Sequence, residues 1–192
     1  MFRRPSVAIL EAFLAEQSGL DFTYKAIGAT ADVSPVGFQV DHTRIKLGEG
    51  EAVYRRARVG LERWDQFRLG WVESWPTDTR LLPGSVVAVV ATQLGIWWLN
   101  ACRIVYVVDE LGPLTRFGFA YGTLPAHAES GEERFLLEWD RSTDTVYYDV
   151  LAFSRPRHLL TQVGYPLIRH LQKRFSRDSA AAMLRSVKDE RD

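Results

Sequence analysis

A single carboxylate stands out for its chemical setting in the last third of the chain. Glu133 alternates along a strand pattern with Phe135, Leu137 and Trp139, so we expect it to share their apolar face. Loss of hydration on such a face raises the pKa of a carboxyl group or requires a hydrogen-bonding partner. Because perturbed carboxylates are commonly structural, the sequence favours a Glu133 held at the mouth of the strand by a loop or an arginine.

A histidine lies close to that carboxylate along the chain. His127 follows a Thr-Leu-Pro segment and precedes Glu132 and Glu133, and a histidine beside two carboxylates is able to move protons or bind a metal. No HxH or HExxH spacing accompanies it, so we expect no metal site. The sequence favours a histidine that pins its loop.

Two further motifs carry less weight. Ser154 and His158 lie close together, but the glycines of a nucleophile elbow are missing, so we do not expect a serine hydrolase. Gly48-Glu49-Gly50 precedes a predicted helix, where backbone N–H groups are able to cradle an anion. A turn into the helix is sufficient to explain these glycines.

The closing helix carries a line of cations. Arg169, Lys173 and Arg177 recur every four residues, so they lie on one side of a helix, beside its apolar stripe. Residues 129–149 hold seven acidic residues against two arginines. We therefore expect helix and sheet rim to attract each other within the fold. A site for an anionic headgroup, a phosphate or a membrane surface is the alternative.

Two adjacent tryptophans add to that alternative. In a strand, one of Trp97 and Trp98 faces inward and the other outward. An exposed tryptophan contacts a partner or a membrane interface, or it packs beneath the N-terminal helix. A peripheral membrane contact or a protein partner therefore stays open as an interaction hypothesis.

Composition sets the broad class of the protein. The 192 residues, 46% of them hydrophobic, fit one domain spanning 1–192 with a sizeable core. The 24 basic and 24 acidic residues cancel, so we expect no nucleic-acid partner. One cysteine, Cys102, excludes an internal disulfide and a cysteine-based zinc site. No signal peptide is evident at the N-terminus, and we expect a cytoplasmic protein without cofactor.

One apolar stretch is long enough to cross a bilayer. Residues 86–108 contain a single charge, Arg103, but they are rich in β-branched residues. Gln93, Gly95 and Asn100 interrupt the stretch. Two buried strands joined by a hairpin explain it better, so we predict no transmembrane segment.

The order of elements predicts the architecture. A helix over 6–17, a strand, a helix carrying Val53, Ala57 and Leu61, and six further strands precede a long amphipathic helix. We predict an α+β helix-grip fold, in which an antiparallel curved sheet of six to seven strands wraps on the C-terminal helix. That helix is expected over 157–187, with a kink near Gly164 and Pro166. The predicted strands cover 38–47, 71–75, 85–92, 102–109, 116–122, 131–139 and 145–153.

The strand at 116–122 separates large from small side chains. Three aromatic residues point one way, whereas Gly118, Ala120 and Gly122 leave the opposite face free for close approach. We predict that the protein is a non-catalytic module for a small apolar or amphipathic molecule held between sheet and helix. The expected ligand-binding residues are Phe117, Phe119, Tyr121, Glu133, Tyr148 and Arg155.

Four segments of the chain resemble a known family. YGTLPAHAESGEERF, AFSRPRHLLTQVGYPLIRHLQKRFSRDSAAAM, LGEGEAVYRRA and IVYVVDE are similar to domain of unknown function nineteen-ninety, found in bacteria and plants. The resemblance covers about residues 22–187, leaving a helical segment over 1–20. It implies membership of the family and no established activity.

The order of strands and helices also resembles the birch-allergen-like and lipid-transfer superfamily, called START-like or SRPBCC. This likeness implies a cavity for an apolar small molecule, by analogy of fold. The superfamily includes cyclases and dehydratases that use a carboxylate or histidine in the cavity. For the enzyme alternative it implies Glu133 as general base, His127 as general acid and Tyr121 as oxyanion donor.

Overall fold

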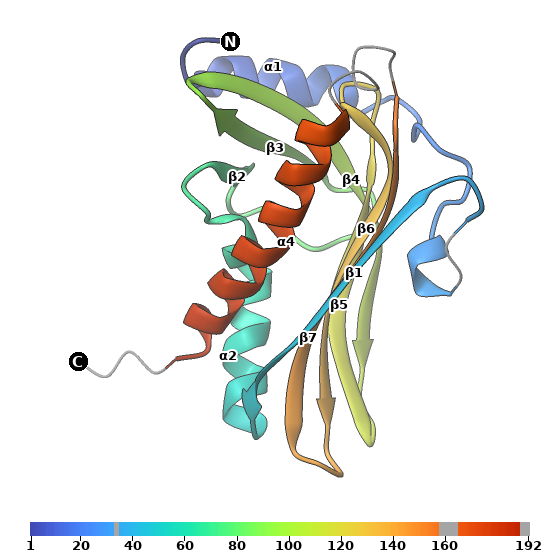
Figure 1. The fold of residues 1–192 in the computed structure, drawn as a ribbon, viewed down its shortest axis with the longest axis vertical. Coiled ribbons are helices and arrows are strands. Elements are labelled where there is room, and N and C mark those ends of the chain that lie inside the picture. The colour runs from blue at the N-terminus through green and yellow to red at the C-terminus, as the bar shows by residue number, and fades with distance from the viewer. Residues whose placement is uncertain (33–34, 158–164, 189–192) are drawn as a thin grey trace.

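A seven-stranded antiparallel sheet forms the body of the protein. The computed structural model describes residues 1–32, 35–157 and 165–188, with 165–168 by their backbone alone. The strand order is β1-β7-β6-β5-β4-β3-β2 (Figure 1). From β2 to β7 each strand therefore pairs with the next one in the sequence, and β7 also pairs with β1. The strands are β1 (Gln39–Glu49), β2 (Val72–Trp75), β3 (Val86–Gln93), β4 (Ile96–Glu110), β5 (Leu114–Thr123), β6 (Glu129–Asp140) and β7 (Thr145–Pro156).

Three α-helices and two short 3-10 helices complete the described chain. The long helix α4 lies across one face of the sheet, beside α2, and α1 lies at the end that carries β3 (Figure 1). This arrangement confirms the predicted helix-grip fold. The helices are α1 (Val7–Gln17), α2 (Glu51–Glu62), α4 (Tyr165–Ser186), η1 (Ala29–Ala31) and η2 (Asp65–Phe67).

Alternation of side chains gives the sheet two different faces. The inner face, which we define as the face toward α2 and α4, carries a continuous row of large apolar residues across β5, β6 and β7. Phe119 lies opposite Phe135, and Phe135 lies opposite Val150. Leu61 of α2 and Met183 of α4 complete this core from the helix side. Burial of this row holds the helices on the sheet.

The last helix bridges the two free edges of the sheet. At the β1 edge, Arg169 binds both carboxylate oxygens of Asp41, with 2.6 Å between Nη2 and Oδ1. Near the β2 edge, the Arg174 guanidinium lies 4.3 Å from the centre of the Trp71 ring, and Trp71 Nε1 donates to Asp178 at 3.0 Å. These contacts fix the helix over the opening between β1 and β2.

The start of the closing helix differs in part from the prediction. The strand β7 continues to Pro156, three residues beyond the predicted end, and the described helix begins at Tyr165. Pro166 therefore lies in the first turn, where backbone N–H groups have no acceptor within the helix, so a proline there costs no hydrogen bond. The predicted kink at Gly164 and the predicted helical residues 158–163 lie outside the described residues.

The N-terminal segment covers the outer face, opposite the helices. Tyr24 is buried there, and a Cβ at Gly122 would lie 2.0 Å from its phenolic oxygen. The glycine face predicted to admit a close neighbour is therefore approached by the chain itself. In the part of the chain that the structure describes, no helix is long and apolar enough to cross a membrane.

Candidate functional site

A carboxyl and a phenol form a pair on the inner face. Tyr121 of β5 lies opposite Glu133 of β6, and its hydroxyl donates to Glu133 Oε2 at 2.7 Å. Burial raises the pKa of Glu133 to about 7, and although the Tyr121 bond opposes this, the carboxylates of Glu129 and Asp41 add to it. No basic side chain of the described residues lies within ion-pair distance of Glu133. This group therefore populates both protonation states near neutral pH.

The surroundings of this pair change abruptly along the strands. On one side the inner face is filled by Phe135 and Tyr148, both fully buried. On the other side the inner positions carry Ala152, which lies opposite Glu133, and Gly131, which lies opposite Ser154. Small side chains replace aromatic ones here. Although they face α4, Glu133, Ala152 and Ser154 remain partly accessible.

The single cysteine lies fully buried on the neighbouring strand β4. Burial raises the pKa of the Cys102 thiol well above its usual value, and the nearby Glu133 carboxylate raises it further. Both groups therefore favour their neutral forms in the same region of the inner face.

A second carboxylate on the same face is held by the closing helix. Gln172 Nε2 donates to both oxygens of Glu129 at 2.7 Å and lies 3.0 Å from Ser154 Oγ. Burial raises the pKa of Glu129, against the lowering effect of these hydrogen bonds. Neither Gln172 nor Asp41 was expected from the sequence, because a polar residue on an amphipathic helix gives no signal of what it will meet.

The predicted ligand-binding residues occupy three different settings. Phe117 and Phe119 are buried core residues, and the Tyr148 hydroxyl lies 2.9 Å from Ser179 Oγ inside the same core. Tyr121 and Glu133 form the pair described above. Arg155 lies on the outer face, where its guanidinium is 4.6 Å from the centre of the Phe38 ring. The structure therefore brings Arg155 to a different face from the others.

His127 lies in the loop between β5 and β6. Its Nδ1 accepts a hydrogen bond from the backbone N–H of Glu129 at 3.0 Å. Burial lowers the pKa of His127 to about 4, so the ring is neutral at physiological pH. Among the described residues, no hydrogen bond joins it to Glu133 or Tyr121. The loop-pinning interpretation therefore accounts for its contacts.

The outer face carries a carboxylate of very different environment. Glu132, adjacent to Glu133 in β6, is 2% exposed and accepts hydrogen bonds from four donors. These are the Tyr24 hydroxyl, the Gly28 N–H, and both the N–H and the hydroxyl of Thr30. Glu132 thereby fastens the N-terminal segment to the sheet.

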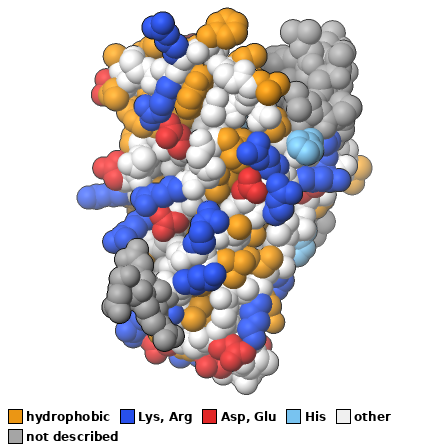
Figure 2. Space-filling model, turned by 60° about the vertical axis from the view of Figure 1, so that its left-hand side comes forward, with side chains coloured by type: hydrophobic (Ala, Val, Ile, Leu, Met, Phe, Trp, Pro, Cys, Tyr) orange, Lys and Arg blue, Asp and Glu red, His pale blue; other side chains and the backbone are white. Residues whose placement is uncertain are grey.

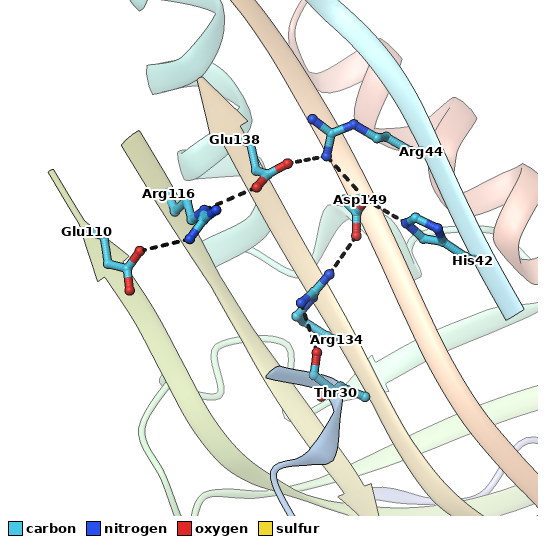
Figure 3. Close-up of polar contacts among 8 residues, drawn as sticks. All are labelled: Thr30, His42, Arg44, Glu110, Arg116, Arg134, Glu138 and Asp149. Atoms are coloured by element: carbon cyan, nitrogen blue, oxygen red, sulfur yellow. Dashed lines mark hydrogen bonds and ion pairs between the residues drawn. The ribbon is translucent and has the colours of Figure 1, made fainter. Parts of the chain in front are cut away.

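A chain of ion pairs extends from this contact along the outer face (Figure 3). Asp149 binds Arg134 at 2.9 Å and His42 at 2.7 Å. Burial alone would raise the pKa of Asp149, but these partners hold it below its usual value. The sequence did not predict this network. In full it joins Glu110, Arg116, Glu138, Arg44, Asp149, His42, Arg134 and Thr30.

The basic line on α4 has one partner outside the acidic segment named in the prediction. Arg169 binds Asp41 of β1, whereas the buried acids Glu138 and Asp149 bind arginines of the sheet itself. Arg169 also lowers the pKa of Glu129, so the expected attraction between the helix and the acidic segment 129–149 includes Glu129, and Asp41 is a further partner that the sequence did not predict. Asp41 is within reach because β1 is an edge strand of the sheet.

The structure also describes the glycine turn before α2 and the two adjacent tryptophans noted in the sequence. The N–H of Gly50 donates to the Asp144 carbonyl at 2.9 Å, so the glycine turn connects β1 to α2. Trp97 packs against the cluster of α1, and Trp98 is 41% exposed. Within the described residues, no three His, Cys, Asp or Glu side chains are grouped closely enough to hold a metal ion.

A curved antiparallel sheet wrapped on a C-terminal helix defines the helix-grip class. The model of the family described as Domain of unknown function (DUF1990) matches residues 23–182, and the chain belongs to this family. A UPF0548 protein of Dictyostelium discoideum is 35% identical over 205 residues, covering 97% of this chain and 94% of that protein. One from Deinococcus radiodurans is 32% identical, covering 97% and 98%.

A solved structure shares the fold at low sequence identity, and two further structures are similar to a lesser degree. A hypothetical protein from Helicobacter pylori has a TM-score of 0.54 at 9% identity, covering 88% of this chain and 96% of that chain. Ara h 8.0201 has a TM-score of 0.49 at 10% identity, covering 77% and 99%. Human STARD10 has a TM-score of 0.44 at 12% identity, covering 95% and 81%.

Proposed function

We propose that this protein binds a small amphipathic molecule between the inner face of β5–β7 and α4. The observation that carries the proposal is Glu133, an inward-facing carboxyl group that remains partly accessible and has, among the described residues, one hydrogen-bonding partner, Tyr121. A carboxyl group removed from water normally acquires enough partners to satisfy it. An unfilled acceptor beside small side chains is the setting in which a ligand supplies the missing hydrogen bond.

The chemistry of the walls supports an amphipathic ligand. Phe135 and Tyr148 form an apolar floor, and Phe175 of α4 packs 6.4 Å from Phe135 between ring centres. The polar groups of this part of the inner face are Glu133 and, beyond it, Glu129 with its Gln172 partner. An apolar group would lie toward the aromatic floor and a hydrogen-bonding group toward the carboxyls.

The test uses full-length protein purified from its own host. Native mass spectrometry followed by organic extraction is expected to show a bound small molecule in the wild type. Ala152→Trp places a large ring on the inner face beside Glu133 and is expected to remove the molecule. Leu151→Trp is the matched control, because the adjacent residue faces outward and the ligand should stay.

Two results contradict the proposal. One is a wild-type protein that carries no extractable molecule and also binds none from a total lipid and metabolite extract of its host. The other is an Ala152→Trp variant that binds as the wild type does while circular dichroism shows both to be folded.

Acid–base catalysis on the same ligand is the second candidate function. It is favoured by a Glu133 carboxyl whose pKa lies at about 7, where proton transfer in either direction is efficient. In this reaction class Glu133 would take or give the proton, and the Tyr121 hydroxyl would hold it in place. The extracted molecule is incubated with wild type and with Glu133→Gln, and products are followed by mass spectrometry. Turnover by the wild type alone, with binding retained in the variant, supports an enzyme; no turnover by either supports a binding module.

A further inference from the structure

A groove runs between the edge strand β1 and the closing helix α4. It has a volume of about 580 Å³, within the usual range of binding sites, and is separate from the Glu133 pair. Figure 2 shows the face on which α4 lies, where Lys and Arg side chains spread among apolar patches. The residues that line the groove are Asp41, His42, Thr43 and Ile45 of β1, and Lys173, Ser176, Arg177, Ala180, Ala181 and Leu184 of α4.

The strand side of this groove is an unpaired sheet edge. In the part of the chain that the structure describes, β1 pairs with β7 and with no other strand. Asp41 and Thr43 point to the inner face and His42 to the outer face, yet all three line the groove. Because side chains that point to both faces of the sheet line the same groove, the groove lies against the edge of the strand. It therefore borders the backbone N–H and C=O groups that β7 leaves unused.

The helix side of the groove has a graded chemistry. Lys173 and Arg177 lie at one end, and the small or apolar Ala180, Ala181 and Leu184 lie at the other. Lys173 is exposed and has no acidic side chain of the described residues within ion-pair distance. The described partner of Arg177 is its neighbour Asp178, at 3.3 Å, and 74% of the Arg177 side chain is exposed. Overall, α4 carries five basic residues and one acidic residue.

The two walls match in length. From Asp41 to Ile45 an antiparallel strand rises about 14 Å, and from Lys173 to Leu184 a helix rises about 16 Å. A strand of about five residues fills that length. Along such a strand, residues two apart face the same side and are separated by about 7 Å, which is close to the rise of about 6 Å over the four helical residues from Arg177 to Ala181.

We propose that an extended acidic peptide segment of a partner protein docks in this groove by adding a strand to the free edge of β1. Its backbone pairs with β1, as in other complexes formed by strand addition. An acidic side chain facing α4 meets Lys173 and Arg177, and an apolar side chain two residues along packs on Ala180, Ala181 and Leu184. Charge complementarity to the helix selects the peptide, and the edge strand supplies most of the affinity.

The experiment selects peptides on the immobilised full-length protein from a phage library of random nonapeptides. Counter-selection uses Lys173→Glu/Arg177→Glu, which reverses the charge of two exposed side chains without touching the core. Enriched sequences are expected to place Asp or Glu two residues from an apolar residue. Synthetic versions should bind the wild type at least tenfold more tightly than the variant, as measured by fluorescence anisotropy.

Backbone pairing has its own test. Methylation of alternate backbone nitrogens in the selected peptide keeps its charges but removes its donors, and it should weaken binding at least tenfold. Ala181→Trp fills the groove without a change of charge and should have the same effect. Amide chemical-shift changes on peptide addition should concentrate at 40–46 and 173–184.

Three results overturn the proposal. The first is a set of peptides enriched equally on the wild type and the charge-reversed variant. The second is binding that survives backbone methylation, which would make the contact purely electrostatic. The third is an absence of enriched peptides together with charge-dependent binding to vesicles of phosphatidylserine, which would assign the basic face to a membrane. None of these outcomes depends on a ligand at Glu133, which lies outside the groove.

Discussion

Glu132 and Glu133 are neighbours in one strand and show how differently the two faces of this sheet use the same side chain. Glu132, on the outer face, accepts hydrogen bonds from four donors of the N-terminal segment. Glu133, on the inner face, accepts one hydrogen bond from the part of the chain that the structure describes, donated by Tyr121. The outer carboxylate is a structural anchor whose partners belong to the chain. The inner carboxyl is left with unused capacity for hydrogen bonding.

The difference extends beyond this pair of residues. The other buried acids of the outer face, Glu138 and Asp149, are paired with arginines of the sheet. On the inner face, burial raises the pKa of both Glu129 and Glu133. Folding therefore pairs those outer-face carboxylates with arginines, whereas on the inner face it raises the affinity of Glu129 and Glu133 for a proton. Proton affinity of this kind is characteristic of functional sites.

The largest expected effect comes from removing the outer anchor. Glu132→Ala leaves four donors of the N-terminal segment without their acceptor, and we expect the free energy of unfolding to fall by about 4 kcal/mol. Urea denaturation followed by circular dichroism measures this. Glu133→Ala is the matched control, one residue away on the opposite face, and should not lower the free energy of unfolding at pH 8, because it removes a carboxylate whose ionised form folding disfavours. Equal losses in the two variants would contradict the contrast between the faces.

A second test measures how the stability of the protein depends on pH, which reports the pKa of Glu133. The pKa of Glu133 is about 7 in the folded chain, against 4.5 ordinarily, so folding takes up a proton between these values. The contribution of Glu133 to stability is therefore fully present below about pH 4.5 and is lost as pH rises toward 7. Relative to wild type, Glu133→Gln should gain stability across this window by up to about 3 kcal/mol. Urea titrations of both proteins at several pH values check it, and a difference independent of pH would refute it.

The smallest effect tests the hydrogen bond inside the inner pair. Tyr121→Phe removes the hydroxyl that donates to Glu133, and because this bond favours the ionised form, the pKa of Glu133 should rise. The loss of stability at pH 8 should be about 1 kcal/mol. Carbon-13 NMR of the labelled Glu133 carboxyl follows the titration. Tyr148→Phe, which loses a bond to Ser179 instead, should leave that titration in place.

Most of the fold was accessible from the sequence because its strands carry clear alternation. The row of Phe117, Phe119 and Tyr121 set against Gly118 and Gly122 predicted a strand with unlike faces, and β5 has them. Lengths were less accessible. The strand at 145–153 continues to Pro156, because Arg155 stacks on Phe38 and pairing with β6 extends to the start of that strand.

The site was accessible only in part, for reasons of geometry. Glu133 and Tyr121 were predicted for the same site but not as hydrogen-bonding partners, because their contact depends on strand register, which the whole sheet sets. Arg155 was grouped with Tyr148, although seven residues along an uninterrupted strand place two side chains on opposite faces. The bond from Arg169 to Asp41 joins positions 128 residues apart, and no local pattern encodes it.

The thiol of Cys102 reports how often the core of this protein opens. The thiol is fully buried on β4 and its pKa is raised, so it reacts with an alkylating reagent only in conformations that expose it. The chain has no second cysteine, so every labelling event reports on this one position.

The labelling rate therefore measures how often the middle of the sheet opens, and the mass of the intact protein is sufficient to follow it. Since Glu133 lies near enough to influence the thiol, a molecule bound at the inner pair would slow the reaction in proportion to its occupancy. Ligands can thus be ranked by reaction time, before any of them has been assigned a biological role.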